Sequence, residues 1–152
     1  MKMLNPAVLI TRKADVRWLE ECLSADMKFF DPAVLMEAVE QNKELFGALS
    51  RVFLRICPEI IQRLEEAIEI ENLLDTANQA HTLASCMFVV GAIRVGEKLE
   101  EIERDARQKT HMFSSVEFVE MKLMLFQVMA EVEHNLLSEI GESAALLQIV
   151  PN

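Results

Sequence analysis

Apolar side chains recur every three or four residues along most of this chain, and that spacing constrains its fold more than any other feature. The clearest stretch runs from Lys43 to about Ile70 and contains Phe46, Leu49, Phe53, Ile56, Ile60, Leu64, Ala67 and Ile68. A period near 3.6 residues places such side chains on one face of an α-helix. The chain has no tyrosine, four glycines and four prolines, so it lacks the turn and strand residues of a β protein. The sequence therefore predicts an all-α protein.

The same spacing predicts further helices over about 14–24, 32–39, 73–90, 92–107 and 115–140. Asp31 is an expected N-cap followed by Pro32 at the first helical position, and Gly91 is expected either to end the 73–90 helix or to thin its packing. Pro58 lies inside the 43–70 stretch and should kink or break it. Four long helices with short connections predict an antiparallel up-and-down four-helix bundle over 30–141. An N-terminal extension, 1–29, with a short amphipathic helix would precede it, and a tail, 142–152, would follow.

Charge and cysteine content narrow the partners and the compartment. The formal net charge is −10 at pH 7, which would repel phosphate backbones and anionic lipid headgroups, so neither nucleic acid nor membrane is expected as a partner. No apolar run approaches the roughly 20 residues that span a bilayer. The three cysteines, Cys22, Cys57 and Cys86, are odd in number and have no CxxC spacing, which favours a reducing cytoplasm over a disulfide framework or a zinc site.

One histidine stands apart from the buried pattern. In the 73–90 helix the expected inward stripe is Leu73, Ala80, Leu83, Met87 and Val90, and His81 falls off it, facing solvent or the rim. The residues expected to share its face are Ala77, Asn78, Ala84, Ser85 and Phe88. Periodicity alone leaves two interpretations open. His81 is either an ordinary surface histidine, with Phe88 in the core, or the centre of a functional surface.

Several short motifs follow one another around this histidine at a consistent spacing. They are DPxxL at Asp31, FL…PE at Phe53, Leu54, Pro58 and Glu59, AHxL at Ala80, His81 and Leu83, the pair Gly91–Ala92, and the pair Ile102–Glu103. In this order, the segment from Phe30 to Glu103 resembles the histidine-containing phosphotransfer (HPt) domains of two-component phosphorelays.

The resemblance implies a phosphocarrier and not an enzyme with turnover of its own. His81 would accept a phosphoryl group from a receiver-domain aspartate and pass it to another, and Glu103 would orient the imidazole. The face formed by Ala77, Asn78, Ala84, Ser85 and Phe88 would dock the receiver. Expected partners are a response-regulator receiver domain, a hybrid histidine kinase or both, and the Mg²⁺ would belong to the receiver, so no cofactor is expected here. A monomer is expected, with a dimer through the N-terminal helix as the alternative.

The chain departs from the family pattern at one place. HPt domains usually read HxxKG, whereas Ala84 and Ser85 occupy the last two positions here. The missing lysine makes a degenerate module, which binds and sequesters a receiver or kinase without carrying phosphate, a serious alternative. A third and weaker alternative is a helical oligomerisation adaptor unrelated to phosphorelays.

A second histidine belongs to a metal-like motif. Glu131 and His134 form one ExxH, but a di-iron bundle needs a second ExxH and two further glutamates. No metal site is therefore expected.

Overall fold

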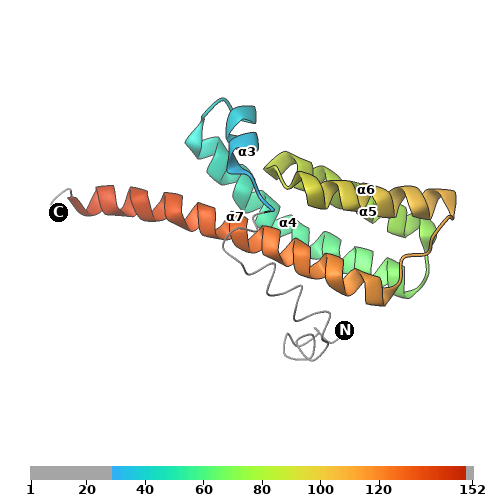
Figure 1. Ribbon diagram of the computed structural model, residues 1–152. Coiled ribbons are helices and arrows are strands. Elements are labelled where there is room, and N and C mark those ends of the chain that lie inside the picture. Colours follow the sequence, from blue (N-terminus) through green and yellow to red (C-terminus); the bar gives the residue numbers. More distant parts are fainter. Residues whose placement is uncertain (1–28, 150–152) are drawn as a thin grey trace.

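The computed structural model describes residues 29–149, with side chains described as far as Ser138. Five helices follow one another: α3 (Pro32–Ala38), α4 (Lys43–Glu69), α5 (Leu73–Val90), α6 (Ile93–Gln108) and α7 (Ser115–Ile149) (Figure 1). The described residues contain no strand, so the all-α prediction is confirmed. The helix expected at about 14–24 lies outside the described residues.

Two long helices continue past residues at which an interruption was expected. Helix α4 runs through Pro58 without a break, so of the two outcomes expected there, a kink or a division into two helices, the division does not occur. Helix α7 continues past Gly141 to Ile149. A single glycine costs a helix only about 1 kcal/mol relative to alanine, and the residues after Gly141 include several good helix formers, with no proline before Pro151.

Local hydrogen bonds explain where the helices begin and end. Asp31, Asn42 and Asn72 are N-caps whose side chains accept backbone N–H groups of the first turns of α3, α4 and α5. Gly91 ends α5 in the left-handed conformation at φ 87°, which costs glycine little because it has no Cβ. The expected cap at Asp31 and the expected end at Gly91 are both confirmed.

A reciprocal pair of hydrogen bonds precedes α7. The Ser114 hydroxyl accepts the Glu117 N–H at 3.1 Å, and the Glu117 carboxylate accepts the Ser114 N–H at 3.2 Å. This capping box satisfies two backbone donors that the first helical turn leaves unpaired.

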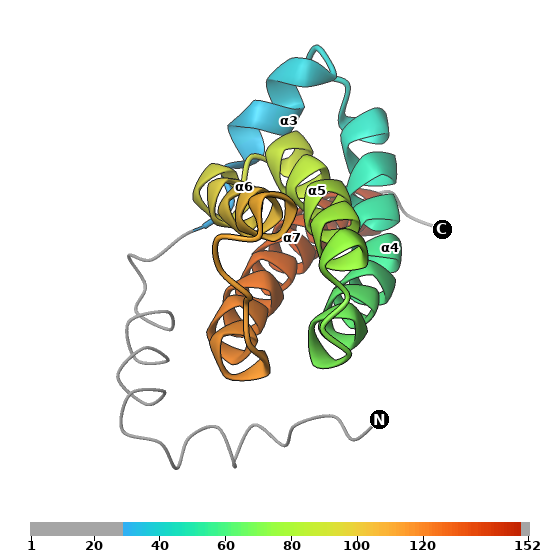
Figure 2. The same ribbon diagram turned by 90° about the vertical axis from the view of Figure 1, so that its right-hand side faces the viewer.

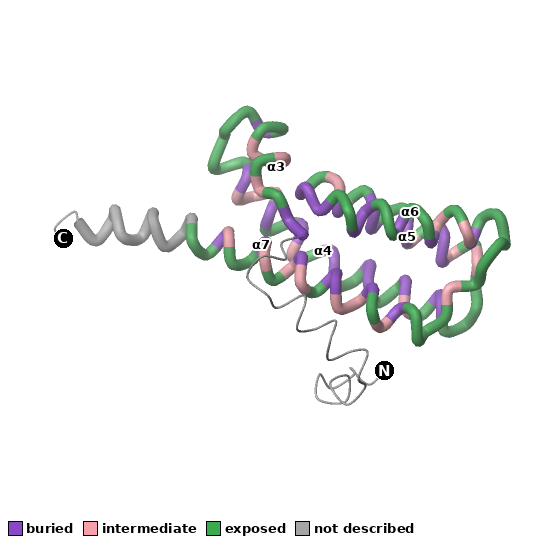
Figure 3. Tube along the Cα trace, in the orientation of Figure 1, coloured by how far each residue is buried: buried purple, intermediate pink, exposed green. Residues whose placement is uncertain are grey.

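The four long helices lie side by side around a common core (Figure 2). Helix α5 packs against both α4 and α6, and α7 packs against α4. Figure 1 shows α4 and α6 running in one direction and α5 and α7 in the other. The buried positions lie where the helices face one another (Figure 3), and the largest buried side chains are Phe46, Phe118, Leu35, Leu64, Leu83, Met87, Leu99 and Leu125. None of the described helices combines the length and the apolar character that crossing a membrane requires.

Helix α7 carries apolar side chains on more than one face. Its buried residues are Phe118, Met121, Met124, Leu125, Val128, Val132 and Leu136, whereas Val116, Phe126 and Leu137 are exposed. Apolar residues surround much of this helix, so their spacing alone does not distinguish its inner face. Lys122 of α7 forms an ion pair with Glu65 of α4, with 2.6 Å between Nζ and Oε2.

Candidate functional site

His81 lies in the middle of α5 with its side chain 65% exposed. The hydroxyl of Ser85, one turn later, donates to the His81 carbonyl at 3.1 Å. Likewise, the Thr82 hydroxyl donates to the Asn78 carbonyl at 3.0 Å. Both hydroxyls are therefore directed to the backbone of their own helix, and the imidazole projects from a helix surface whose neighbouring side chains are uncharged.

Helix α6 brings a carboxylate to the ring. After the turn at Gly91, α6 packs along α5, and Oε1 of Glu103 lies 3.0 Å from Nδ1 of His81. The Glu103 side chain is only 17% exposed. The expected contact between His81 and Glu103 is thus present, while their roles in phosphoryl transfer stay predictions.

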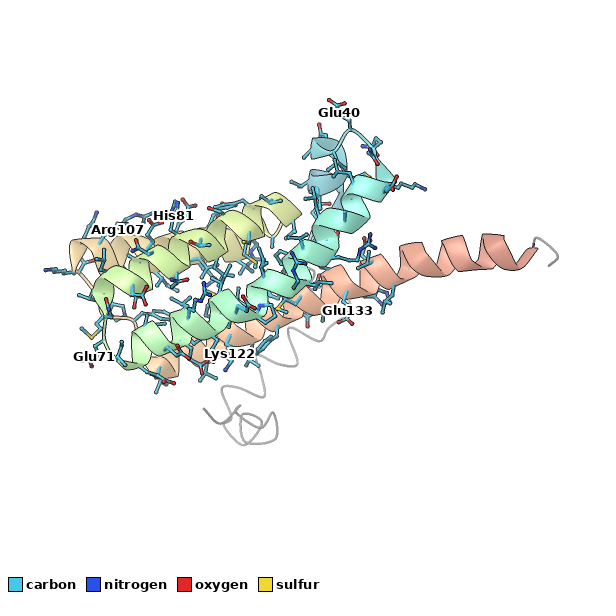
Figure 4. All side chains as sticks on the ribbon, turned by 180° about the vertical axis from the view of Figure 1, so that it is seen from behind. Glu40, Glu71, His81, Arg107, Lys122 and Glu133 are labelled. Atoms are coloured by element: carbon cyan, nitrogen blue, oxygen red, sulfur yellow. The ribbon has the colours of Figure 1, made fainter. Side chains whose placement is uncertain are left out.

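Arg107 completes this group from the next turn of α6. Its Nε donates to Oε2 of Glu103 at 2.9 Å, and its Nη2 donates to Oδ1 of Asn78 at 3.3 Å. The two oxygens of Glu103 thus serve two different partners, Nδ1 of His81 and Nε of Arg107. The labelled side chains of His81 and Arg107 lie on the same outer side of the α5 and α6 pair (Figure 4).

The charge state of Glu103 determines which ring nitrogen can react. Partial burial by itself would raise the pKa of Glu103, but the hydrogen bonds and charges of Arg107 and His81 together lower that pKa below its usual range. An ionised carboxylate can only accept hydrogen bonds, so Nδ1 carries the proton of the neutral ring. Nε2 then holds the free lone pair, and it has no hydrogen-bond partner among the described residues. Nε2 is consequently the ring nitrogen whose lone pair is available.

Three residues of the expected docking face are buried to different degrees, which corrects that expectation. Ala77 is 0% exposed and Ala84 is 3% exposed, so neither methyl group is available to a partner. Phe88 is half-buried, and its ring packs over Gly96 of α6. Helix α5 packs against both α4 and α6, so the buried part of its surface is wider than the single apolar face that was expected. Small apolar residues such as alanine fit where two helices approach closely. Of the expected face, Asn78 and Ser85 are exposed.

Two apolar side chains that the sequence analysis missed are exposed on the same helix. Leu74 and Val89 are 67% and 54% exposed, and they lie two turns before and two turns after His81. Their spacing of seven and eight residues from His81 could have identified them. Arg107 was also missed, and its position four residues after Glu103 was the available signal.

One small hollow, of about 270 Å³, adjoins this group and is lined by Glu103 and Arg107 with Glu100, Arg104 and Gln108. Two larger hollows lie away from His81. One of about 460 Å³ is lined by residues of α7 with Phe30 and Pro32, and Glu131 and His134 are among them. The Glu131 carboxylate accepts the Phe29 N–H at 3.0 Å. A second hollow, of about 450 Å³, lies between α6 and α7. In the part of the chain that the structure describes, no three His, Cys, Asp or Glu side chains gather in a way that could hold a metal ion.

These features define a class of protein: a helical domain that presents an exposed histidine on an open helix surface, its ring in contact with a carboxylate from the next helix. The family model described as "Hpt domain" matches residues 48–141. The chain therefore belongs to the Hpt domain family, whose members are phosphocarrier proteins of phosphorelay signalling and interact with receiver domains and histidine kinases.

A solved structure shares the fold. The crystal structure of histidine-containing phosphotransfer protein B from Pseudomonas aeruginosa PAO1 superposes with a TM-score of 0.66. The match covers 76% of this chain and 98% of that one, at 18% sequence identity. No curated protein sequence matches the chain.

Proposed function

We propose that this protein carries a phosphoryl group on Nε2 of His81 between receiver-domain aspartates of a two-component phosphorelay. The observation that supports this most directly is the exposed imidazole whose Nδ1 lies 3.0 Å from the Glu103 carboxylate. The carrier is the antiparallel up-and-down four-helix bundle over 30–141, with α3 beside it. It has no turnover of its own, because the histidine is regenerated only when a second partner removes the phosphoryl group.

The transfer balances without any cofactor bound to this chain. The Nε2 lone pair attacks the phosphorus of an aspartyl phosphate, the P–O bond to the aspartate breaks, and the aspartate leaves as a carboxylate. The ring becomes an imidazolium that keeps its proton on Nδ1. The Glu103 carboxylate accepts a hydrogen bond from this N–H group. The reverse sequence delivers the phosphoryl group to the next aspartate. The Mg²⁺ that neutralises the transferred group belongs to the receiver.

The partner surface is the exposed face of α5. A receiver domain, or the receiver of a hybrid histidine kinase, would contact Asn78 and Ser85 around the histidine and reach Leu74 and Val89 at the ends of the face. Covering Leu74 and Val89 with a partner would remove apolar surface from water and so favour binding. We place the protein in the cytoplasm as a monomer, on the strength of its cysteine content and its family.

The alternative is a degenerate module that binds a receiver without accepting phosphate. Ala84 favours it, because the lysine of the HxxKG pattern is missing. The intact pairing of His81 with Glu103 favours the carrier, because sequestration does not require an oriented nucleophile.

The test is phosphate uptake from phosphorylated receiver domains. Wild type should gain a phosphate that is labile in acid and stable in alkali, as a phosphoramidate is, and His81→Gln should gain none. His134→Gln is the matched control, because it removes another exposed histidine, on α7. If wild type takes up no phosphate from a receiver that it binds in calorimetry, the carrier function is refuted and the sequestering module is supported.

A further inference from the structure

We propose that Arg107 is a positioning residue of this site, which holds Glu103 against Nδ1 of His81 and supplies the positive charge beside the reacting ring. The inference rests on the proposed phosphocarrier function, and it identifies Arg107 as the positively charged side chain that assists His81.

The guanidinium joins two helices around the histidine. Nε donates to Oε2 of Glu103 on its own helix, and Nη2 donates across to Oδ1 of Asn78, which lies one turn before His81 on α5. A planar guanidinium presents its donors at fixed angles, so the bond to Asn78 fixes the orientation of the guanidinium, and the bond to Glu103 then restricts the carboxylate. With Oε2 held by Arg107, Oε1 remains directed to the ring.

The surrounding residues leave this role to Arg107. On the exposed face of α5 next to the histidine lie Asn78, Thr82 and Ser85, and none of them is charged. Ala84, the position where the family usually has lysine, is buried. Arg104 follows Glu103 on α6 but makes no hydrogen bond with this group in the described part of the chain.

The role has a chemical consequence that a purely structural role would not have. When Glu103 accepts from Nδ1, only Nε2 is free to form the P–N bond. If the carboxylate is released, the ring can also expose Nδ1 as its lone-pair nitrogen, because neutral imidazole exchanges between two tautomers. Loss of Arg107 should therefore change both how fast the phosphoryl group is accepted and which nitrogen accepts it.

The experiment uses the full chain and phosphoramidate as the donor. In this reaction the P–N bond of phosphoramidate breaks, ammonia leaves with the electron pair, and Nε2 forms the new bond to phosphorus. The uptake rate and the phosphorylated nitrogen are read by ³¹P and ¹⁵N NMR for wild type, Arg107→Gln, Arg107→Lys and Arg104→Gln. Arg104→Gln is the matched control, because it removes the same charge from the same helix.

Arg107→Gln should slow phosphorylation of Nε2 roughly fivefold, the factor of a favourable ion pair, and phosphate should also be found on Nδ1. Arg107→Lys should recover part of the rate, since it keeps the charge but not the fork that reaches both Glu103 and Asn78. Arg104→Gln should stay within about twofold of wild type, because exposed charges without a partner contribute little.

Three results would overturn the inference. They are a wild-type rate with Nε2 alone phosphorylated in Arg107→Gln, an equal loss in Arg104→Gln, and no difference between Arg107→Lys and Arg107→Gln. If Arg107→Gln fails to fold by circular dichroism, Asn78→Ala removes one arm of the contact and should slow uptake by a smaller factor; an unchanged rate there would equally refute the role. A wild-type chain that takes up no phosphate refutes the phosphocarrier function instead, so the two failures are distinguishable.

Discussion

The ring of Phe88 on α5 lies so close to Gly96 on α6 that a Cβ atom at position 96 would be 2.7 Å from Cε1 and 2.9 Å from Cδ1. The two helices that carry His81 and Glu103 approach each other at this point. The glycine is therefore a packing requirement of the α5 and α6 pair.

A double-mutant cycle tests that requirement. Gly96→Ala alone should destabilise the protein by about 1–2 kcal/mol, because overpacking outweighs the better helix propensity of alanine. In a Phe88→Ala background the same change should stabilise by about 0.5–1 kcal/mol, since only the propensity remains. Urea unfolding followed by circular dichroism measures both. Equal destabilisation in the two backgrounds would show that the ring is not the reason for the glycine.

Gly91 is a second position where alanine should be costly. Its φ of 87° disfavours a side chain, and a Cβ there would collide with the Asp31 carbonyl oxygen and approach Val34 Cβ at 2.9 Å. Gly91→Ala should lower the free energy of unfolding by about 2–4 kcal/mol. Gly47→Ala in α4 is the control, because its Cβ would meet only Arg51 atoms at 3.6 Å or more. That change should stabilise by about 0.5–1 kcal/mol. A similar loss at both positions would contradict this account.

The ionisation of Glu103 should depend on Arg107. Burial raises the pKa of Glu103, but the hydrogen bond from Arg107, followed by that from His81, lowers it below the ordinary 4.5. A depressed carboxyl pKa contributes stability that is present above the unfolded value and is lost as the pH falls through the folded value. In a ¹³C NMR titration, Arg107→Gln should move the Glu103 pKa upward and shift the loss of the His81 contact to higher pH. An unmoved titration would mean that Arg107 does not act on this carboxylate.

Two cysteines on neighbouring helices should differ in reactivity. A hydrogen bond from the Cys57 thiol lowers the pKa of Cys86 to about 7, although burial opposes the shift. The pKa of Cys57 is raised, first by this hydrogen bond and then by burial. In a Cys22→Ser background, alkylation of Cys86 by iodoacetamide should rise through pH about 7, because the thiolate is the nucleophile. Cys57→Ala should move that midpoint toward the ordinary 9.0. Mass spectrometry after digestion identifies the alkylated residue, and prior modification of Cys57 would refute the assignment.

Sequence patterns predicted the helices better than the faces. Side chains that act within a few residues, such as the cap at Asp31 and the left-handed Gly91, need only local information, and both predictions were confirmed. The side that a helix buries depends on what packs against it. Ala77 and Ala84 were expected outside and are buried. An alanine side chain alone does not indicate whether its position is buried or exposed, because that depends on where the neighbouring helix packs.

The candidate site shows the same division. The position of His81 around its helix, away from the apolar residues of that helix, predicted that its side chain is exposed, and the structure agrees. The partner 22 positions away, Glu103, came from a family resemblance and not from periodicity. Arg107 needed both its spacing from Glu103 and the approach of α5, which supplies Asn78. Contacts between helices are the part that a single sequence could not supply.

The imidazole of His81 projects from the convex surface of a helix, so a partner of any size can approach it. An enclosed site rejects wrong substrates by exclusion, whereas this surface can only discriminate by how well a partner fits around the histidine. Under the proposed function, changes at Leu74 and Val89, two turns from the histidine, would redirect the protein to a different partner while the chemistry at His81 stays the same. The choice between partners of different signalling pathways in one cell would then depend on Leu74 and Val89 at the ends of the exposed α5 face, and not on His81 at its centre.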